Sequence, residues 1–268
     1  MRKIAWHRVI ICLGVIGLAV YLTVNLFSAN KEEVICKGID VKIKNKKDAK
    51  LITSEDVADI ITSSRITATG KALNDSVVKK VKTLLDTKSY IKDAVVYRTG
   101  DSVLHVELEQ RIPVVRIVTN TGSCYLDDEG YAFPPSLRYS YNVPLVTGNV
   151  PLPHALPYKG PLLKKSDFVQ DILMFANFLS KNSFWNAQIQ QINVDNDKNI
   201  EFVTCTDDIL IRLGQFNNFE EKLENLYAFY KKVIPNDGSK YEILDLRFNK
   251  QIVAVKKQNQ ITDSEIEI

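Results

Sequence analysis

The sequence predicts an α+β protein that begins with a single transmembrane helix. Three patterns indicate this fold class. The first is an uncharged run of 19 residues, Val9–Phe27. The second is a β-α-α-β-β order of apolar patterns over residues 34–109, and the third is a mostly β region with two helical patterns over residues 110–257. A content of 45% hydrophobic and 25% charged residues is that of a globular protein.

Residues 1–27 have the composition of a membrane anchor that is retained. A basic head, residues 1–8, contains Arg2, Lys3 and Arg8. As a helix, residues 9–27 reach across about 28 Å, close to the thickness of a hydrocarbon core. The alternative is a cleaved signal peptide, but residues 27–30 lack its small-residue cleavage pattern. The positive-inside rule then places the head in the cytoplasm and the rest of the chain across the membrane.

Charge and cysteine content narrow the function of the exported part. The head holds three of the 35 Lys and Arg residues, so the remaining 32 balance the 32 Asp and Glu residues. A neutral exported part lacks the basic surface that nucleic-acid binding requires. Three cysteines follow the anchor without a C-x-x-C motif, and a long-range pair of Cys124 with Cys205 stays open.

Residues 34–109 contain the elements of a small two-layer module. A first strand over residues 34–43 precedes a capping-box sequence at Thr53–Asp56, which predicts a helix start. Asn74-Asp75-Ser76 opens a second helix whose apolar residues recur at helical spacing. Residues 94–97 and 102–108 alternate as the strands of a β-hairpin.

Residues 110–257 form the mostly β part, and a polar tail over residues 258–268 follows it. Helices are expected from Ser166 and from a capping box at Asn218, the second ending before Pro235. Seven prolines lie between residues 134 and 161, which predicts an extended connection along the surface. The expected strands are residues 114–119, 123–126, 131–133, 189–194, 200–205, 209–213, 241–248 and 251–257.

Motifs for enzyme chemistry are incomplete. Ser76-Val77-Val78-Lys79 matches S-x-x-K and Arg98-Thr99-Gly100 resembles K-T-G, a combination found in penicillin-recognising acyltransferases. The two lie about twenty residues apart in a module too small for that fold, so Ser76 is interpreted as a helix cap. A cell-wall hydrolase or acyltransferase is therefore the enzyme alternative, and no catalytic residue is predicted.

Metal and acid–base motifs are equally incomplete. Asp195–Asn199 begins like an EF-hand loop, but Ile200 stands where glycine is needed, which favours a hairpin turn. Asp127-Asp128-Glu129 is interpreted as a solvated turn, and His105 is placed on the outward side of a strand. No metal site, cofactor site or small-molecule substrate is predicted. The sequence instead favours a scaffold that binds proteins through a sheet edge, with the last strand as the candidate.

Four motifs follow the anchor and the β-α-α-β-β pattern in this order: Glu109–Ile117, Tyr125–Phe133, Pro144–Gly148 and Asp245–Phe248. Together they resemble the motifs of the bacterial cell-division family FtsQ/DivIB. The resemblance implies a POTRA domain at residues 34–109 and the family's β domain at residues 110–257. Arg111 and Pro113 would then form the joint between them, the alternative being a proline tolerated on the edge strand of one domain.

The resemblance also implies a function and a binding site. Family members have no known catalytic role and join the FtsB–FtsL pair to septal wall synthesis, whose synthase is FtsW–FtsI, at the cytoplasmic membrane of the division septum. FtsB is bound by strand addition at the last strands. Arg247 would meet a partner acid, the alternative being a surface ion pair worth about 0–1 kcal/mol. Phe248 would pack where relatives often place Tyr. The residues that would line the added edge are Asn249, Lys250, Ile252 and Val253.

The alternative function is a POTRA-containing envelope secretion or assembly factor. Such a protein would need a C-terminal transmembrane barrel or repeated POTRA modules, and the sequence predicts neither.

Overall fold

The computed structural model divides the chain into two compact units, and each is described by itself. The first unit comprises residues 1–42, 54–85 and 94–107, and the second comprises residues 43–53, 86–93 and 108–268. The residues that the structure describes are 3–29, 34–44, 51–66, 70–135, 140–237, 240–248 and 250–257. The predicted polar tail, residues 258–268, lies outside the described residues.

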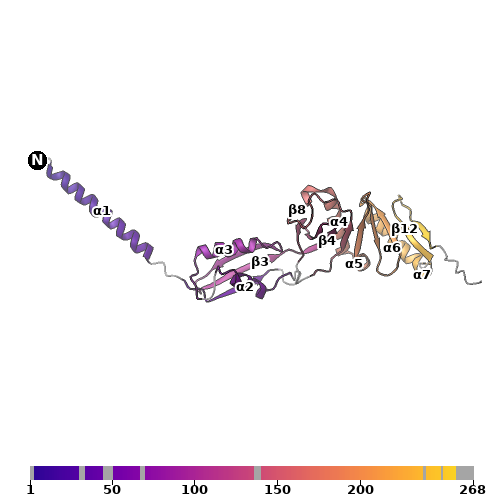
Figure 1. The fold of residues 1–268 in the computed structure, drawn as a ribbon, viewed down its shortest axis with the longest axis horizontal. Helices are drawn as coiled ribbons and strands as arrows, with labels where there is room; N and C mark the ends of the chain where they lie inside the picture. The colour runs from indigo at the N-terminus through magenta and orange to yellow at the C-terminus, as the bar shows by residue number, and fades with distance from the viewer. Residues whose placement is uncertain are drawn as a thin grey trace, which may run out of the picture. The chain divides into compact units, whose positions relative to one another are not determined.

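The N-terminal helix α1 covers Lys3–Ala29 (Figure 1). In the part of the chain that the structure describes, no helix meets both the length and the apolarity required to cross a membrane. The transmembrane helix expected at residues 9–27 therefore stays a prediction.

The β-α-α-β-β order predicted for residues 34–109 is present. Its strands pair in the order β1-β3-β2, so β3 lies between the other two. The strand β2 begins three residues before the predicted hairpin strand at residue 94. The bounds are β1 (Gly38–Ile43), α2 (Ser54–Ser63), α3 (Asp75–Asp86), β2 (Ile91–Arg98) and β3 (Val103–Gln110).

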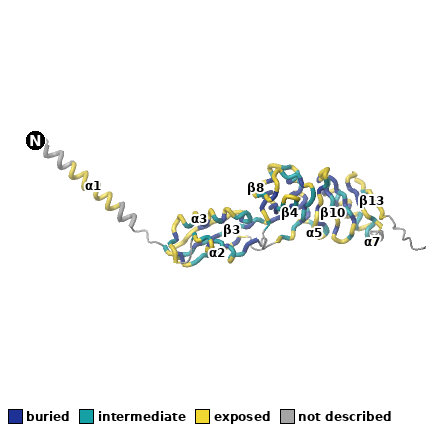
Figure 2. Tube along the Cα trace, viewed as in Figure 1, coloured by how far each residue is buried: buried dark blue, intermediate teal, exposed yellow. Residues whose placement is uncertain are grey.

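Alternation and helical spacing explain the core of this module. Strand β3 buries every second residue from Leu104 onward, as the period-two pattern predicts (Figure 2). Helix α2 buries Val57 and Ile61, and α3 buries Val81 and Leu85. The Lys82 ammonium on α3 donates to the Ala94 carbonyl of β2 at 3.0 Å, which holds helix and sheet together.

The cap of α3 differs from the prediction. The Asn74 side-chain oxygen accepts a hydrogen bond from the Val77 backbone N–H at 3.1 Å, so Asn74 is the cap. Ser76 lies inside the first turn of α3, and its predicted capping role is wrong.

A ten-stranded sheet organises the second unit. Its strands follow one another in the order β13-β12-β11-β10-β9-β7-β4-β5-β6-β8. Neighbours are parallel at β4–β7, β7–β9 and β11–β12. The bounds are β4 (Pro113–Thr119), β5 (Gly122–Asp127), β6 (Tyr131–Phe133), β7 (Leu145–Gly148), β8 (Gly160–Pro161), β9 (Gln191–Val194), β10 (Ile200–Val203), β11 (Leu210–Gly214), β12 (Tyr241–Asp245) and β13 (Val253–Lys256).

The proline-rich segment is more than a surface connection. Strand β7 comes from this segment and lies inside the sheet between β4 and β9, while Val150 and Leu156 are buried in the core. Gly148 ends β7 with a φ of +90°, and a Cβ there would lie 2.2 Å from the Val194 carbonyl oxygen. Only glycine fits this position, because it needs both the left-handed backbone and the close approach.

The second unit has more helices than the two predicted. The expected helix at Ser166 is confirmed, since the Ser166 hydroxyl accepts a hydrogen bond from the Val169 backbone N–H at 3.3 Å. Asn218 does not cap α6 with its side chain, because its backbone is left-handed at a φ of 52°. The helices are η1 (Leu163–Lys165), α4 (Asp167–Lys181), α5 (Ser183–Gln188), α6 (Phe219–Lys232) and α7 (Ile234–Asp237).

One hydrophobic core joins the helices of this unit to its sheet. Buried residues of α4 and α6, such as Phe175 and Leu223, belong to the same cluster as Phe202, Ile211 and Leu244 of β10, β11 and β12. The alternate residues of these strands point away from that core. They form a second face, which is called the open face here.

Candidate partner-binding edge

The strand β13 is the last strand at one end of the ten-stranded sheet, as predicted for the final strand of the chain. Helix α6 connects β11 to β12 and makes them parallel, and the loop 246–252 brings β13 back antiparallel to β12. Because β13 pairs with β12 alone among the described strands, its other side presents unpaired backbone donors and acceptors.

One hydrogen bond fixes which amides of β13 face outward. The Lys257 N–H donates to the Lys240 carbonyl at 2.9 Å, toward the side of β12. Since backbone N–H groups alternate in direction along a strand, those of Val253 and Val255 face β12 as well. The N–H groups of Ala254 and Lys256 therefore point to the open edge.

The side chains near this edge are unusually apolar for exposed positions. Phe248 is 52% exposed, and Val253 and Val255 are each 43% exposed. The predicted site residue Ile252 differs from them, because it is half-buried against the core. Lys250 is exposed in the loop with a left-handed backbone at a φ of 56°. Asn249 lies outside the described residues.

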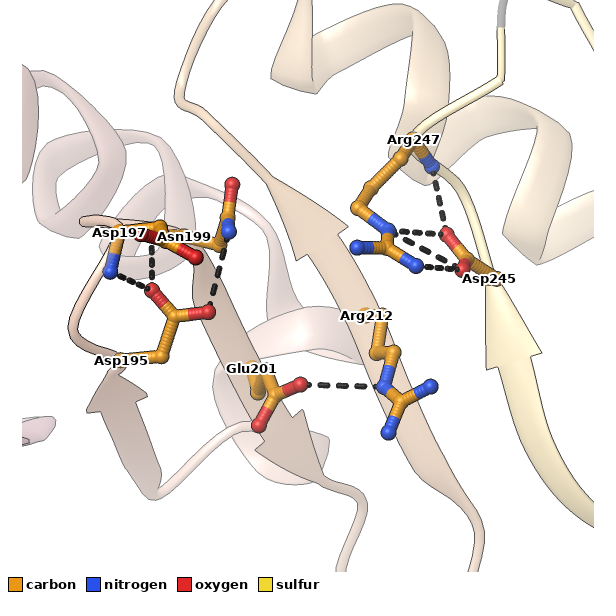
Figure 3. A network of polar contacts seen from close by, with 7 residues as sticks. All are labelled: Asp195, Asp197, Asn199, Glu201, Arg212, Asp245 and Arg247. Atoms are coloured by element: carbon orange, nitrogen blue, oxygen red, sulfur yellow. Dashed lines mark hydrogen bonds and ion pairs between the residues drawn. The ribbon is translucent and has the colours of Figure 1, made fainter.

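Arg247 is engaged within its own chain. Its Nη2 lies 2.6 Å from Asp245 Oδ2, its Nε lies 2.9 Å from Oδ1, and its backbone N–H donates to Oδ1 at 3.0 Å (Figure 3). The Arg247 side chain is nevertheless 45% exposed, against 8% for that of Asp245. Burial would raise the pKa of Asp245, but the hydrogen bonds and charge of Arg247, with Arg212 behind it, lower this pKa overall.

Asp245 belongs to a row of charges that crosses the open face. Glu201 on β10 is paired in register with Arg212 on β11, and Arg212 with Asp245 on β12. The Arg212 Nε lies 3.1 Å from Glu201 Oε1 (Figure 3). The next position of the row, on β13, is Val253. The row of alternating charges thus ends at an apolar residue on the edge itself.

Gly214, at the end of β11, makes room for Arg247. Its φ is +76°, and a Cβ on it would lie 2.8 Å from Arg247 Cγ. Glycine therefore supplies both the left-handed turn after β11 and the space in which the Arg247 stem rests.

A pocket of about 420 Å³ lies between the loop 246–252 and the loop that follows β11. Its lining includes Arg247, Phe248 and Gln251. The Lys222 ammonium fixes the second loop by donating to the Leu213 and Gln215 carbonyls, both at 3.0 Å. Burial lowers the pKa of Lys222. The pocket is thus a polar recess directly beside the exposed end of Arg247.

The predicted joint residues Arg111 and Pro113 lie in a buried polar cluster. Arg111 Nη1 is 2.6 Å from Asp127 Oδ2, and the guanidinium lies 3.6 Å from the centre of the Tyr131 ring. Asp127 also accepts backbone hydrogen bonds from Glu129 and Tyr131. Pro113 is the first residue of β4 and is paired in register with Asp127. The role of this cluster as a joint stays a prediction.

Asp127 itself corrects the sequence interpretation. Asp127-Asp128-Glu129 was expected to be a solvated turn, but Asp127 is only 1% exposed. The missed signal is Arg111, 16 residues earlier. In the fold its guanidinium donates to the Asp127 carboxylate and offsets the cost of burying that charge.

The remaining motifs have structural roles. Asp195–Asn199 forms the β9–β10 hairpin turn, as predicted, with the Asp195 carboxylate accepting hydrogen bonds from the Asp197 and Asn199 backbone N–H groups at 2.8 Å (Figure 3). Cys124 and Cys205 are free thiols, the first buried and the second exposed, so the disulfide between them that the sequence left possible is not present. Burial raises the pKa of Cys124 to about 12.

Comparisons with known proteins agree with the resemblance seen in the sequence. Residues 34–109 match the model of a POTRA-like domain, and residues 112–255, more than half of the chain, match the model described as FtsQ/DivIB, C-terminal related. A curated relative, the cell division protein FtsQ of Rhodothermus marinus, is 28% identical over 180 residues, which cover 65% of this chain and 63% of that protein. The chain therefore belongs to the FtsQ/DivIB family, with a POTRA-like domain preceding the family's C-terminal region.

Proposed function

We propose that this chain is a cell-division protein that works as a non-enzymatic scaffold and binds its partner by strand addition at β13. Membership of the FtsQ/DivIB family supports the cell-division role. The same family match favours this function over a POTRA-containing secretion or assembly factor. The observation that carries the binding mode is the position of β13 at the end of the sheet, with its outer backbone groups unpaired among the described strands.

The proposed partner is the FtsB–FtsL pair, which the scaffold would link to septal peptidoglycan synthesis by FtsW–FtsI. A strand added to β13 would gain backbone hydrogen bonds from the outward amides of Ala254 and Lys256. Its side chains would meet Val253 and Val255 on the open face, both 43% exposed. Arg247 supplies the charged contact at the start of the edge, where its guanidinium is reachable from solvent.

Strand addition at β13 would displace little of the chain's own structure. The backbone of β13 is already extended and paired on one side, so the partner does not have to order this edge and binding loses less conformational entropy. Arg247 keeps Asp245 as a counter-charge, and a partner carboxylate can approach the exposed part of the guanidinium while that pair is retained.

Capture of the FtsB–FtsL pair by the full chain in detergent tests this proposal. Ala254→Pro removes an outward N–H without removing a β12–β13 hydrogen bond, so we expect loss of capture with the fold retained. Ala254→Ser is the matched control, because it keeps the N–H and is expected to bind normally. Unchanged capture by Ala254→Pro, with a normal circular dichroism spectrum, would place the interface elsewhere.

We propose further that α1 anchors the chain in the cytoplasmic membrane with its N-terminus inside the cell. The uncharged run at residues 9–27 and the basic head before it support this location. Carbonate extraction of membranes tests it: an anchored chain stays in the pellet, and a chain that is released with peripheral proteins contradicts the proposal.

A further inference from the structure

A groove of about 740 Å³ runs between α6 and the corner where α4 meets α5. Its floor is aromatic. Phe184 packs edge-on against Trp185 and Tyr227, with ring centres 4.8 and 4.9 Å apart. Phe178, at the end of α4, lines the same groove. These rings belong to helices, so the groove is a different surface from the strand edge β13.

The rim of the groove on α6 is acidic. Glu220, Glu224 and Tyr227 follow one another at positions i, i+4 and i+7, so they lie on one stripe of the helix, and Glu221 lines the groove beside them. All three glutamates are exposed. Within the described ranges, no cationic side chain forms an ion pair with any of them.

Three glutamates so close together on α6 repel one another, which slightly destabilises the helix. Glu220 and Glu221 lie in the first turn of α6, where the helix dipole favours negative charge. Glu224 lies one turn later, at i+4 from Glu220 and i+3 from Glu221, and like charges at these spacings repel each other. The third carboxylate is therefore unfavourable in the free protein and favourable once a cation is present.

The chain itself shows that a cation suits this stripe. The Lys231 ammonium, one turn beyond Tyr227 on the same face of α6, lies 5.4 Å from the centre of the Tyr227 ring. The acidic end of the stripe has the ring and the carboxylates, but among the described residues no cation pairs with these carboxylates. Three carboxylates over an aromatic floor repel anions and leave a cationic group as the complementary ligand.

We propose that this groove binds a lysine- or arginine-bearing segment of a partner protein. The cationic head lies between Glu220 and Glu224, and the alkyl stem packs on the Phe184 and Tyr227 rings. A bare metal ion is a poorer occupant, since in the described part of the chain no three His, Cys, Asp or Glu side chains converge to hold one. The inference is independent of strand addition at β13.

Trp185 provides a built-in reporter for the test, because it is one of two tryptophans and lies in the groove floor. The full chain carrying Trp6→Phe is titrated with a short helical peptide of leucine and lysine, and with a twin in which glutamine replaces every lysine. We expect the lysine peptide to change Trp185 fluorescence and the twin to bind at least tenfold more weakly, a difference of about 1.4 kcal/mol.

Variants of the groove assign the effect. Glu220→Gln with Glu224→Gln is expected to raise the Kd for the lysine peptide about tenfold, whereas Glu242→Gln, an exposed acid on β12, is the matched control and leaves it unchanged. Tyr227→Ala, which removes the ring but no charge, is expected to weaken binding as well. Ala254→Pro at β13 is expected to leave peptide binding intact, which separates this proposal from strand addition.

Three results would overturn the proposal. One is equal binding of the lysine peptide and its glutamine twin. Another is unchanged affinity in the Glu220→Gln, Glu224→Gln variant. The third is a dimer of the full chain, seen by sedimentation without peptide, that this double variant dissociates, because the occupant would then be a second copy.

Discussion

Two Arg–Asp pairs in the second unit have the same contact distance and opposite surroundings. In both, a guanidinium nitrogen lies 2.6 Å from a carboxylate oxygen. In the pair Arg111–Asp127 the side chains are 11% and 2% exposed, whereas in Arg247–Asp245 they are 45% and 8% exposed. Both acids are buried, so the two pairs differ mainly in the exposure of their arginines.

The exposure of the arginine decides what each pair can do. Arg111 packs against the Tyr131 ring, and the Asp127 carboxylate accepts hydrogen bonds from backbone N–H groups, so the pair leaves little surface for another molecule. Arg247 is fixed by Asp245 on one side and open to solvent on the other. A buried pair is therefore expected to act on stability, and a half-exposed pair on recognition.

The largest effect is expected from breaking the buried pair. Asp127→Ala leaves the Arg111 guanidinium buried without its counter-charge, which should lower the free energy of unfolding of the second unit by about 3–5 kcal/mol. Urea denaturation measures this. Combining Asp127→Ala with Arg111→Met should recover part of the loss, because no unpaired charge then remains buried. A loss below about 1 kcal/mol would remove the distinction between the two pairs.

A smaller effect is expected from Gly214→Ala. The added Cβ would meet Arg247 Cγ at 2.8 Å, and alanine is strained at a φ of +76°. We expect a loss of about 1–3 kcal/mol in unfolding free energy together with weaker capture of the FtsB–FtsL pair, because Arg247 must move. Gly100→Ala, at a position where an added Cβ meets no neighbour within 4 Å, is the control. Normal capture by Gly214→Ala would show that the position of Arg247 is unimportant.

Arg247→Gln should change stability less than Asp127→Ala while reducing recognition. Asp245 keeps the backbone N–H of residue 247 and the nearby charge of Arg212, and glutamine can still donate a hydrogen bond, so the melting temperature should fall less than in Asp127→Ala. Capture of the partner should fall, and should fall further in Arg247→Glu. Arg98→Glu, which breaks the exposed pair with Asp75 in the first unit, serves as a charge-reversal control. A large loss of stability without a change in capture would reverse the roles assigned to the two pairs.

The smallest effect concerns exposed charges in the first unit. His105 lies 3.2 Å from both Asp40 and Asp101, beside Thr99 and the Tyr97 ring. Desolvation would lower the pKa of His105, but the two carboxylates raise it overall. A raised histidine pKa stabilises the fold fully below the unfolded value of about 6.5, and this contribution is lost as pH rises through the folded pKa.

Asp101 sets the lowest pH at which its ion pair with His105 stabilises the fold. Its hydrogen bonds from Thr99 and Val103 lower its pKa to about 2, so its contribution is present above about 4 and is lost as pH falls toward 2. We therefore expect His105→Gln to lower the melting temperature of the first unit more at about pH 5 than at about pH 8.5. An equal shift at both pH values would mean that the two ion pairs contribute nothing.

Elements with a long or regular pattern were predictable from the sequence. Strand β3 and helices α3 and α4 have clear periods, and the helix predicted to start at Ser166 is capped by the hydroxyl of that residue. Strand β7 was missed because four residues after a proline are too few to show alternation. The six-residue helix α5 is too short for a helical period in the same way.

The candidate site was predictable in position but not in its contacts. The final strand lies at a sheet edge, as expected from its place in the chain. The Asp245–Arg247 pair depends on the space left by Gly214, 33 residues before Arg247, and the burial of Asp127 depends on Arg111. Such contacts join residues distant in sequence, so local patterns do not show them.

Hydrogen exchange at the edge tests the central claim most directly. The amides of Ala254 and Lys256 are measured in the full chain, alone and in complex with the FtsB–FtsL pair. Strand addition at β13 predicts that these two amides exchange quickly in the free chain and become strongly protected in the complex, while Val255, already paired with β12, changes little. A complex that forms while Ala254 and Lys256 keep their fast exchange would contradict strand addition at this edge.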